Sequence, residues 1–231
     1  MQAVILAGGR GTRLGYRALN LPKPMIPVGG RPFLEYVLDG LVDDGITGVI
    51  LSVGHKAQAI RVHFGSSYRG MPLTYAIETE PLGTGGAIAN ALANTGNEPA
   101  LVLNGDTLLK IDFSDLIKWY VRDPAPVAIV LRQMEEVARY GAVVVEGERV
   151  AGFSEKGRSG SGLINAGVYV IQPDVLRTFG LPRVFAFESD FLQRYCVELR
   201  PRAYVTRAYF IDIGIPSDLD RAQAELPNLA L

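Results

Sequence analysis

Residues 1–30 read MQAVILAGGRGTRLGYRALNLPKPMIPVGG, and in this stretch an apolar run meets a group of glycines and several cations. Residues 2–7 (QAVILA) are apolar and are followed by glycines, which predicts a short buried strand. Glycines after a first strand usually let the backbone approach a phosphate closely. We therefore predict that residues 8–12 form a loop whose free N–H groups hold a phosphate.

Two common phosphate-binding motifs do not fit this loop. A P-loop needs GxxxxGK[ST], and no such run occurs in the chain. A dinucleotide fingerprint needs GxGxxG, but Leu14 stands where its third glycine should be. What remains is a glycine-rich loop followed by Arg13 and then by Lys23 between Pro22 and Pro24. Arginine binds phosphate in a bidentate fork and lysine acts as a compact point charge, so both residues suit a phosphate.

Beyond this loop, apolar runs alternate with amphipathic segments. In the first half we predict strands at 46–53, 73–78 and 99–103, and helices at 32–44, 57–64 and 83–94. In the second half we predict strands at 127–132, 141–145, 150–154, 163–171 and 203–213, a helix within 182–199, and a closing helix over 217–225 with Ser217 as its N-cap.

This alternation implies right-handed crossovers and a mostly parallel sheet that is covered on both faces. We predict an α/β fold with a mixed central sheet, which the second half of the chain extends in a more antiparallel manner. With 231 residues and no linker-like stretch, one domain is favoured over two small ones. That domain would consist of a part over about residues 1–122 and a part over about residues 123–231.

The composition argues against several classes of function. The formal net charge is −1, whereas a nucleic-acid partner usually requires a basic face. Cys196 is the sole cysteine, so no internal disulfide can form, and we expect a reduced, half-buried thiol in a cytoplasmic protein. No apolar run approaches the roughly 18 residues of a membrane span, and nothing marks a signal peptide.

The stretches LAGGRGTRLG (6–15) and LPKPMIPVGGRP (21–32) resemble the signature LAGGxGTRL…PKPM(I/L)PVxGKP of the sugar-1-phosphate nucleotidyltransferases. Arg31 stands where that family often has lysine. The resemblance covers nearly the whole chain and implies a Rossmann-like three-layer sandwich. Further motifs follow in the expected order: GHKAQAI (54–60), ETEPLGTGGAI (78–88), LVLNGDTL (101–108), RYGAVVV (139–145), FSEK (153–156), INAGVYV (164–170) and FIDIGIPSD (210–218).

The family reaction joins a sugar 1-phosphate to a nucleoside triphosphate and releases pyrophosphate. Because the attacking phosphate oxygen is already ionised near neutral pH, the protein mainly positions two anions and neutralises charge. The resemblance implies that Arg13 grips the β- and γ-phosphates, that Lys23 stabilises the transition state at the α-phosphate, and that Asp106 and Asp212 hold Mg²⁺. The nucleotide would contact Leu6, Ala7, Gly8, Gly9, Gly11, Thr12, Glu78, Glu80, Gly83, Thr84 and Asp106.

On the sugar side, the resemblance points to Asn104, Gly141, Glu155, Lys156 and Asn165. Glu155 can accept hydrogen bonds from sugar hydroxyls, and Asn165 can both donate and accept them. Lys156 can pair with the sugar phosphate. Each of these residues also has a purely structural interpretation, since Glu155 and Lys156 could form a solvated charged turn and Gly141 could be a glycine at a strand entry.

The nucleotide base is predicted from one side chain. Family members that use UTP or dTTP typically have glutamine where Glu78 stands. A carboxylate only accepts hydrogen bonds, and guanine offers two adjacent donors, N1–H and the 2-amino group. Glu78, with Glu80 as the second choice, therefore favours GTP.

The short guanylyl-type form most resembles bacterial D-glycero-α-D-manno-heptose 1-phosphate guanylyltransferases, which supply GDP-heptose for capsule, surface-layer glycan or lipopolysaccharide. We expect no C-terminal β-helix domain. The alternatives are a mannose-1-phosphate guanylyltransferase, an N-acetylmuramate-1-phosphate uridylyltransferase, and a regulatory subunit that binds nucleotide sugars without catalysis. Retention of Arg13, Lys23, Asp106 and Asp212 favours an enzyme. Its partners would be GTP and a sugar 1-phosphate, with a homodimer as one option.

Overall fold

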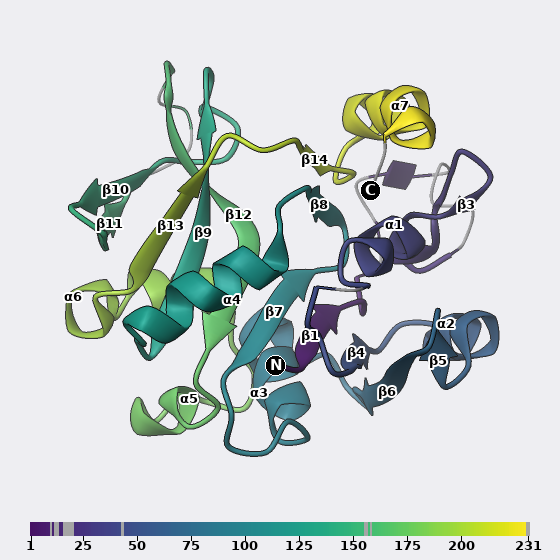
Figure 1. Cartoon of the computed structure of the whole chain (residues 1–231), viewed down its shortest axis with the longest axis horizontal. Coiled ribbons are helices and arrows are strands. Elements are labelled where there is room, and N and C mark those ends of the chain that lie inside the picture. Colours follow the sequence, from purple (N-terminus) through teal and green to yellow (C-terminus); the bar gives the residue numbers. More distant parts are fainter. Residues whose placement is uncertain are drawn as a thin grey trace.

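The computed structural model describes residues 1–9, 11, 14–15, 21–42, 44–154, 157 and 159–229, and ten strands within these ranges form one sheet (Figure 1). Their order is β10-β11-β13-β9-β12-β7-β1-β4-β6-β5. The bounds of these strands are β1 (Ala3–Leu6), β4 (Val49–Val53), β5 (Ser67–Tyr68), β6 (Met71–Ile77), β7 (Ala100–Asn104), β9 (Val127–Met134), β10 (Val143–Glu146), β11 (Arg149–Phe153), β12 (Gly162–Ile171) and β13 (Arg202–Thr206).

The first half of the chain forms the parallel part of this sheet. β1 pairs in parallel with both β4 and β7, and β4 pairs in parallel with β6. In the second half, β12 runs antiparallel to β7 and β9, while β13 runs parallel to β9. The sheet is therefore mixed, and its second half extends the first through the pairing of β12 with β7.

Helices cover both faces of the sheet because neighbouring strand residues point to opposite sides. Ile5 packs into the core under α1 (Phe33–Asp39), α2 (Ala57–Phe64), α4 (Phe113–Arg122) and α7 (Pro216–Glu225). Val4 packs into the other core, with α3 (Gly83–Leu92), α5 (Val175–Thr178), a π-helical turn (Phe187–Gln193) and α6 (Cys196–Leu199). These three layers confirm the fold class that we predicted.

Helix α4, which crosses in front of the sheet in Figure 1, is absent from our sequence-based prediction. Its signals are present in the sequence all the same. The Asp112 side chain accepts a hydrogen bond from the Asp115 amide at 2.9 Å and so caps the helix. Phe113, Leu116 and Tyr120 form its buried stripe.

Three other sequence-based predictions are corrected by the structure. The strand predicted at 203–213 is interrupted, because β13 ends at Thr206 and a separate strand, β14 (Phe210–Asp212), pairs elsewhere. Ser217 is not the N-cap of the closing helix, since α7 begins at Pro216 after Ile215. Cys196 is fully buried rather than half-buried, with its thiol 3.7 Å from the Val150 carbonyl oxygen.

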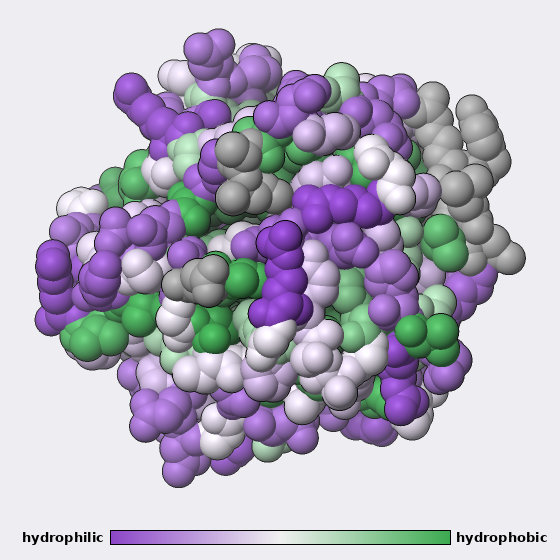
Figure 2. Space-filling view, turned by 45° about the vertical axis from the view of Figure 1, so that its right-hand side comes forward, coloured by the Kyte–Doolittle hydropathy of each residue, from purple (hydrophilic) through white to green (hydrophobic). Residues whose placement is uncertain are grey.

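On the surface, hydrophilic residues are spread over most of the face shown in Figure 2, between smaller hydrophobic groups. The exposed large hydrophobic residues are mostly valines from separate elements, such as Val62 on α2 and Val197 on α6. None of the helices in the described ranges combines the length and apolar character that crossing a bilayer requires.

The N-terminus of α3 is glycine-rich because a segment of the second half packs directly against it. The Gly85 amide donates to the Phe185 carbonyl at 3.0 Å, and the Phe185 amide donates to the Leu82 carbonyl at 3.1 Å. A Cβ at Gly86 would collide with the Arg183 carbonyl oxygen and would lie 2.9 Å from the Leu82 Cβ. The glycines thus let two distant parts of the chain meet backbone to backbone.

We expect Gly86→Ala to lower the free energy of unfolding by about 1–3 kcal/mol, because backbone atoms must shift to admit the methyl group. Urea unfolding of wild type and variant measures this change. Gly152→Ala on β11 is the control, since a Cβ there has no neighbour within 4 Å. Equal unfolding midpoints for Gly86→Ala and wild type would show that this contact is loose.

Candidate active site

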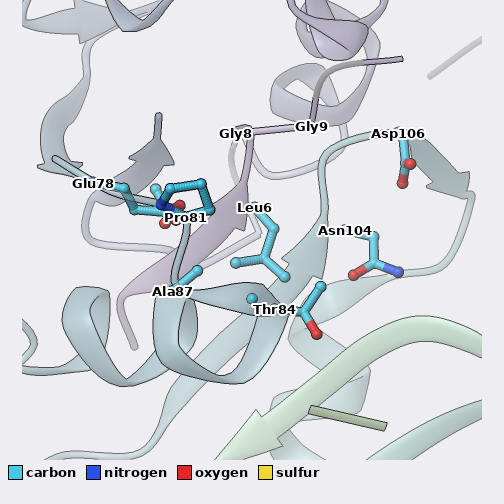
Figure 3. A pocket seen from close by; sticks show the side chains of 11 residues that line it. Leu6, Gly8, Gly9, Glu78, Pro81, Thr84, Ala87, Asn104 and Asp106 are labelled. Atoms are coloured by element: carbon cyan, nitrogen blue, oxygen red, sulfur yellow. Dashed lines mark hydrogen bonds between the residues drawn. The ribbon is translucent and has the colours of Figure 1, made fainter. Parts of the chain in front are cut away.

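A cavity of about 360 Å³ opens at the carboxyl ends of the parallel strands, which is where open α/β sheets bind ligands. Leu6 ends β1, Asn104 ends β7 and Glu78 follows β6. In Figure 3, Glu78 and Asp106 lie on opposite sides of this cavity, with Leu6 between them. The lining residues are Leu6, Gly8, Gly9, Ser52, Glu78, Pro81, Gly83, Thr84, Ala87, Asn104 and Asp106.

The glycine loop after β1 forms one wall of this cavity. A Cβ on Gly8 would lie 3.1 Å from Glu78 Oε1, so a larger residue would press on that carboxylate. Gly11 has a φ of +66°, a conformation that favours glycine. Ala7 is buried beneath the loop, and its amide donates to the Ser52 carbonyl at 2.8 Å. Thr12 and Arg13, which we also predicted for the phosphates, lie outside the described residues.

Lys23 is held beside the glycine loop by its backbone. Its amide donates to the Gly9 carbonyl at 3.0 Å, and residues Lys23–Met25 form a 3₁₀ turn after Pro22. Its ammonium makes an ion pair with Asp106, and its Nζ lies 3.7 Å from Asp212 Oδ1. The structure therefore brings together three of the residues that we predicted for catalysis and metal binding.

A small second sheet joins the two aspartates, which are 106 positions apart in the sequence. β8 (Thr107–Leu109) pairs antiparallel with β14, and this pairing sets Asp212 opposite Thr107. The Ile213 amide donates to the Asp106 carbonyl at 3.0 Å. The interruption of the strand predicted at 203–213 is what lets Asp212 leave the main sheet and reach Asp106.

The surroundings of Asp212 disfavour the charged form of its carboxylate. Burial, and then the neighbouring Asp106, raise the pKa of Asp212, while Lys23, the Gly214 amide and Arg139 oppose that rise. The Gly214 amide donates to Asp212 Oδ1 at 2.7 Å. A metal ion beside Asp212 would favour its ionised form.

The two aspartates have the chemistry of ligands to a magnesium ion. Mg²⁺ is usually bound by one or two carboxylates, with substrate phosphates and waters completing its shell. In the part of the chain that the structure describes, no group of three or more His, Cys, Asp or Glu residues forms a self-sufficient metal site. Asp106 and Asp212 would therefore hold the ion together with substrate oxygens.

The two glutamates considered for the base occupy different positions. Glu78 lines the cavity, where Oε2 accepts from the Leu82 amide at 3.2 Å and Oε1 accepts from the Ser52 hydroxyl at 3.5 Å. Glu80 does not line this cavity; its side chain is half exposed and forms an ion pair with Arg183. Glu80 and His55 both line a smaller hollow, of about 240 Å³, on the other side of Glu78.

A second cavity, of about 430 Å³, adjoins the first and shares Leu6, Thr84 and Asn104 with it. Its remaining lining residues are Ile88, Tyr169, Ala186, Phe187, Glu188, Ser189 and Gln193. No local pattern singles out Glu188, Ser189 or Gln193, because Phe187, Phe191 and Leu192 favour an apolar helix there. The sequence signal for this part of the site was the presence of polar residues between those apolar positions.

Asn165 reaches this second cavity indirectly. Its Nδ2 donates to Glu188 Oε1 at 3.1 Å and to the Tyr169 hydroxyl at 2.8 Å, and its Oδ1 accepts from the Gly167 amide. Burial, and then Glu188, raise the pKa of Tyr169 far above its usual value. That hydroxyl stays protonated, so Asn165 and Tyr169 together orient the carboxylate of Glu188.

The other residues predicted for the sugar are less informative. Gly141, with a φ of +79°, ends the turn 137–140 and is not among the lining residues of either cavity. Glu155 and Lys156 lie outside the described residues. On the nucleotide side, Gly83 has a φ of +72°, and the Thr84 hydroxyl accepts from the Phe187 amide at 2.9 Å.

Known proteins resemble this chain over nearly its full length. It is 42% identical over 228 residues to a D-glycero-alpha-D-manno-heptose 1-phosphate guanylyltransferase of Aneurinibacillus thermoaerophilus, covering 99% of each chain. It is 44% identical over 219 residues to the protein of that name from Campylobacter jejuni, covering 94% of this chain and 96% of the other.

A solved structure of HddC from Yersinia pseudotuberculosis complexed with GMP-PN is also similar. It is 36% identical, with a TM-score of 0.84, and the match covers 97% of this chain and 99% of the other. The nucleotidyl transferase family model matches residues 2–228. The prediction from the sequence motifs is thereby confirmed, and this chain belongs to the nucleotidyl transferase family.

Proposed function

We propose that this protein transfers GMP from GTP to D-glycero-α-D-manno-heptose 1-phosphate in the cytoplasm, giving GDP-heptose and pyrophosphate for a bacterial surface glycan. The observation that carries the proposal is the convergence of Lys23, Asp106 and Asp212 at a cavity with Glu78 on its far side. The names of the relatives at 42% and 44% identity support both the nucleotide and the sugar.

In this reaction an oxygen of the sugar phosphate attacks the α-phosphorus of GTP. A new P–O bond forms, the bond from the α-phosphorus to the bridging oxygen breaks, and pyrophosphate leaves with that electron pair. The glycine loop holds the triphosphate through backbone N–H groups, while Lys23 faces the α-phosphate and balances the charge of the transferring group. Mg²⁺, held by Asp106 and Asp212, would neutralise phosphate charge when bound.

Guanine fits the first cavity through Glu78. Its carboxylate is fixed by the Leu82 amide and the Ser52 hydroxyl and borders the glycine loop. A carboxylate so oriented can accept hydrogen bonds from N1–H and the 2-amino group of guanine, a pair that adenine and the pyrimidines lack. Glu80 has its own partner in Arg183, which makes it the weaker candidate.

The sugar fits the second cavity, which joins the first at Asn104 and Thr84. Glu188 is the acceptor for sugar hydroxyls there, oriented by Asn165 and Tyr169. The part over about residues 1–122 would thus bind the nucleotide, and the part over about residues 123–231 would supply most contacts to the sugar.

Pyrophosphate release by the purified protein with Mg²⁺ tests this function. GTP, ATP, UTP, CTP and dTTP are each paired with the heptose phosphate, mannose 1-phosphate, glucose 1-phosphate and N-acetylmuramic acid 1-phosphate. We expect turnover with GTP and the heptose phosphate. Turnover confined to mannose 1-phosphate would show that the sugar substrate is mannose 1-phosphate. Turnover with UTP and the muramic acid phosphate would overturn the assignment of guanine as the base. No turnover with any pair would favour a subunit that binds nucleotide sugars without catalysis.

Lys23→Ala should lower kcat by at least about a hundredfold, because the charge facing the α-phosphate is lost. Steady-state kinetics with GTP measures the change, and a circular-dichroism melt checks that the variant is folded. Lys118→Ala, an exposed lysine on α4 that pairs with Asp115, is the matched control and should leave kcat unchanged. A near-normal kcat for Lys23→Ala would show that Lys23 is not a catalytic residue.

Glu78→Gln should reduce kcat/KM for GTP by about tenfold or more, since one charged acceptor is replaced by an amide that no longer suits two adjacent donors. The ratio of kcat/KM for GTP to that for UTP is the measurement, and it should fall. Glu80→Gln, outside the lining of the first cavity, is the control. A fall in that ratio for Glu80→Gln alone would move the base contact to Glu80.

Glu188→Gln should raise KM for the sugar phosphate by about tenfold while KM for GTP stays constant, because hydrogen bonds to a charged acceptor contribute about 1.5–3 kcal/mol. Glu198→Gln on α6 carries the same change at an exposed position and serves as the control. If both Michaelis constants remained at the wild-type value, the sugar would lie elsewhere.

A further inference from the structure

Asp212 has a second cationic neighbour besides Lys23. Arg139 lies in the turn 137–140, which the Tyr140 and Gly141 amides close by donating to the Val137 carbonyl at 2.9 and 3.1 Å. The ring of Tyr140 packs edge-on against Phe210 of β14, with ring centres 5.9 Å apart. The turn is thereby fixed beside the strand that carries Asp212.

Arg139 forms a long ion pair with one oxygen of Asp212 but makes no hydrogen bond to it. Oδ1 of Asp212 already accepts from the Gly214 amide at 2.7 Å and is the oxygen nearest to Lys23. Oδ2 faces Arg139 Nη2 at 3.9 Å, which is beyond hydrogen-bond distance. The guanidinium is therefore the group best placed to occupy the oxygen that a metal ion would need.

A third aspartate binds the guanidinium more closely than Asp212 does. Asp218, in the first turn of α7, forms a close ion pair with the same Nη2 of Arg139. Its side chain is only 9% exposed, so its charge is fixed in place and requires a partner. The N-terminal end of the helix dipole also favours a carboxylate at this position.

We propose that Asp218 is a positioning residue that holds Arg139 off Asp212, so that Asp212 Oδ2 stays available to a divalent cation. This inference rests on the proposed function, in which Asp106 and Asp212 hold the metal. Lys23, Arg139, Asp106, Asp212 and Asp218 together carry a net charge of −1, which attracts a divalent ion. Without the charge of Asp218, Arg139 would turn to Asp212 as a strong arginine–carboxylate pair and compete with the ion.

The experiment measures binding of Mn²⁺ by electron paramagnetic resonance, in the presence of guanosine 5′-(α,β-methylene)triphosphate and without a sugar phosphate, so that no turnover occurs. Asp218→Asn removes the charge and keeps the shape. We expect it to weaken Mn²⁺ binding by about ten- to a hundredfold, as residues behind metal ligands commonly do. Asp218→Ser is a second variant that removes the charge with a smaller side chain, and thermal melts show which variants are folded.

The double variant Arg139→Met/Asp218→Asn is the decisive control, because it restores the net charge of the wild-type cluster and removes the competing guanidinium. We expect its Mn²⁺ affinity to return to within about threefold of wild type, which a purely structural role of the pair would not produce. Wild-type affinity in Asp218→Asn and Asp218→Ser would overturn the proposal. So would a double variant as weak as the single one.

Asp212→Asn distinguishes a failure of the role proposed for Asp218 from a failure of the proposed metal site. Loss of Mn²⁺ binding in Asp212→Asn, with wild-type binding in the Asp218 variants, would leave the metal site standing and overturn the role of Asp218 alone. Unchanged binding in Asp212→Asn would overturn the metal site itself and this inference with it.

Discussion

Two half-buried carboxylates that face each other repel one another unless a cation lies nearby, and in this protein Lys23 is the cation that pairs with both. Its ammonium touches Asp106 and approaches Asp212, and its backbone is tied to the glycine loop through Gly9. One side chain thus links the predicted phosphate loop, the predicted metal ligands and the second half of the chain. In the proposed reaction, this same charge would lie beside the α-phosphate of the nucleotide.

The strand topology brings Asp106 and Asp212 together. β14 leaves the main sheet and pairs with β8, and the register of that pair places Asp212 opposite the residue after Asp106. A continuous strand from 203 to 213 would have kept Asp212 in line with β13, at the other side of β9 and β12. Arg139 and Asp218 arrive at the same place from a turn and from the start of α7, so that five charged side chains from distant segments lie together.

The neighbouring cavities also depend on contacts between the two halves. The glycine-rich N-terminus of α3 lets residues 183–187 approach its backbone, and this contact forms the second cavity beside the first. Thr84 marks the junction, since it lines both cavities and accepts a hydrogen bond from Phe187. A side chain in place of Gly83, Gly85 or Gly86 would disturb the meeting of the two parts.

The sequence by itself determined the family, the α/β class, most of the strands and most of the residues that line the first cavity, but not Ser52, Pro81 or Ala87. These features depend on local patterns: apolar runs, glycines after a strand, and motifs that keep their spacing. Helix α4 could also have been predicted from such a pattern, because Asp112 caps it and Phe113, Leu116 and Tyr120 form its apolar stripe. Only the tertiary structure decided that Asp212 meets Asp106, that Glu188 faces a cavity, and that Asp218 holds Arg139. Those relations depend on strand register and on packing between segments far apart in the chain, which no local periodicity encodes.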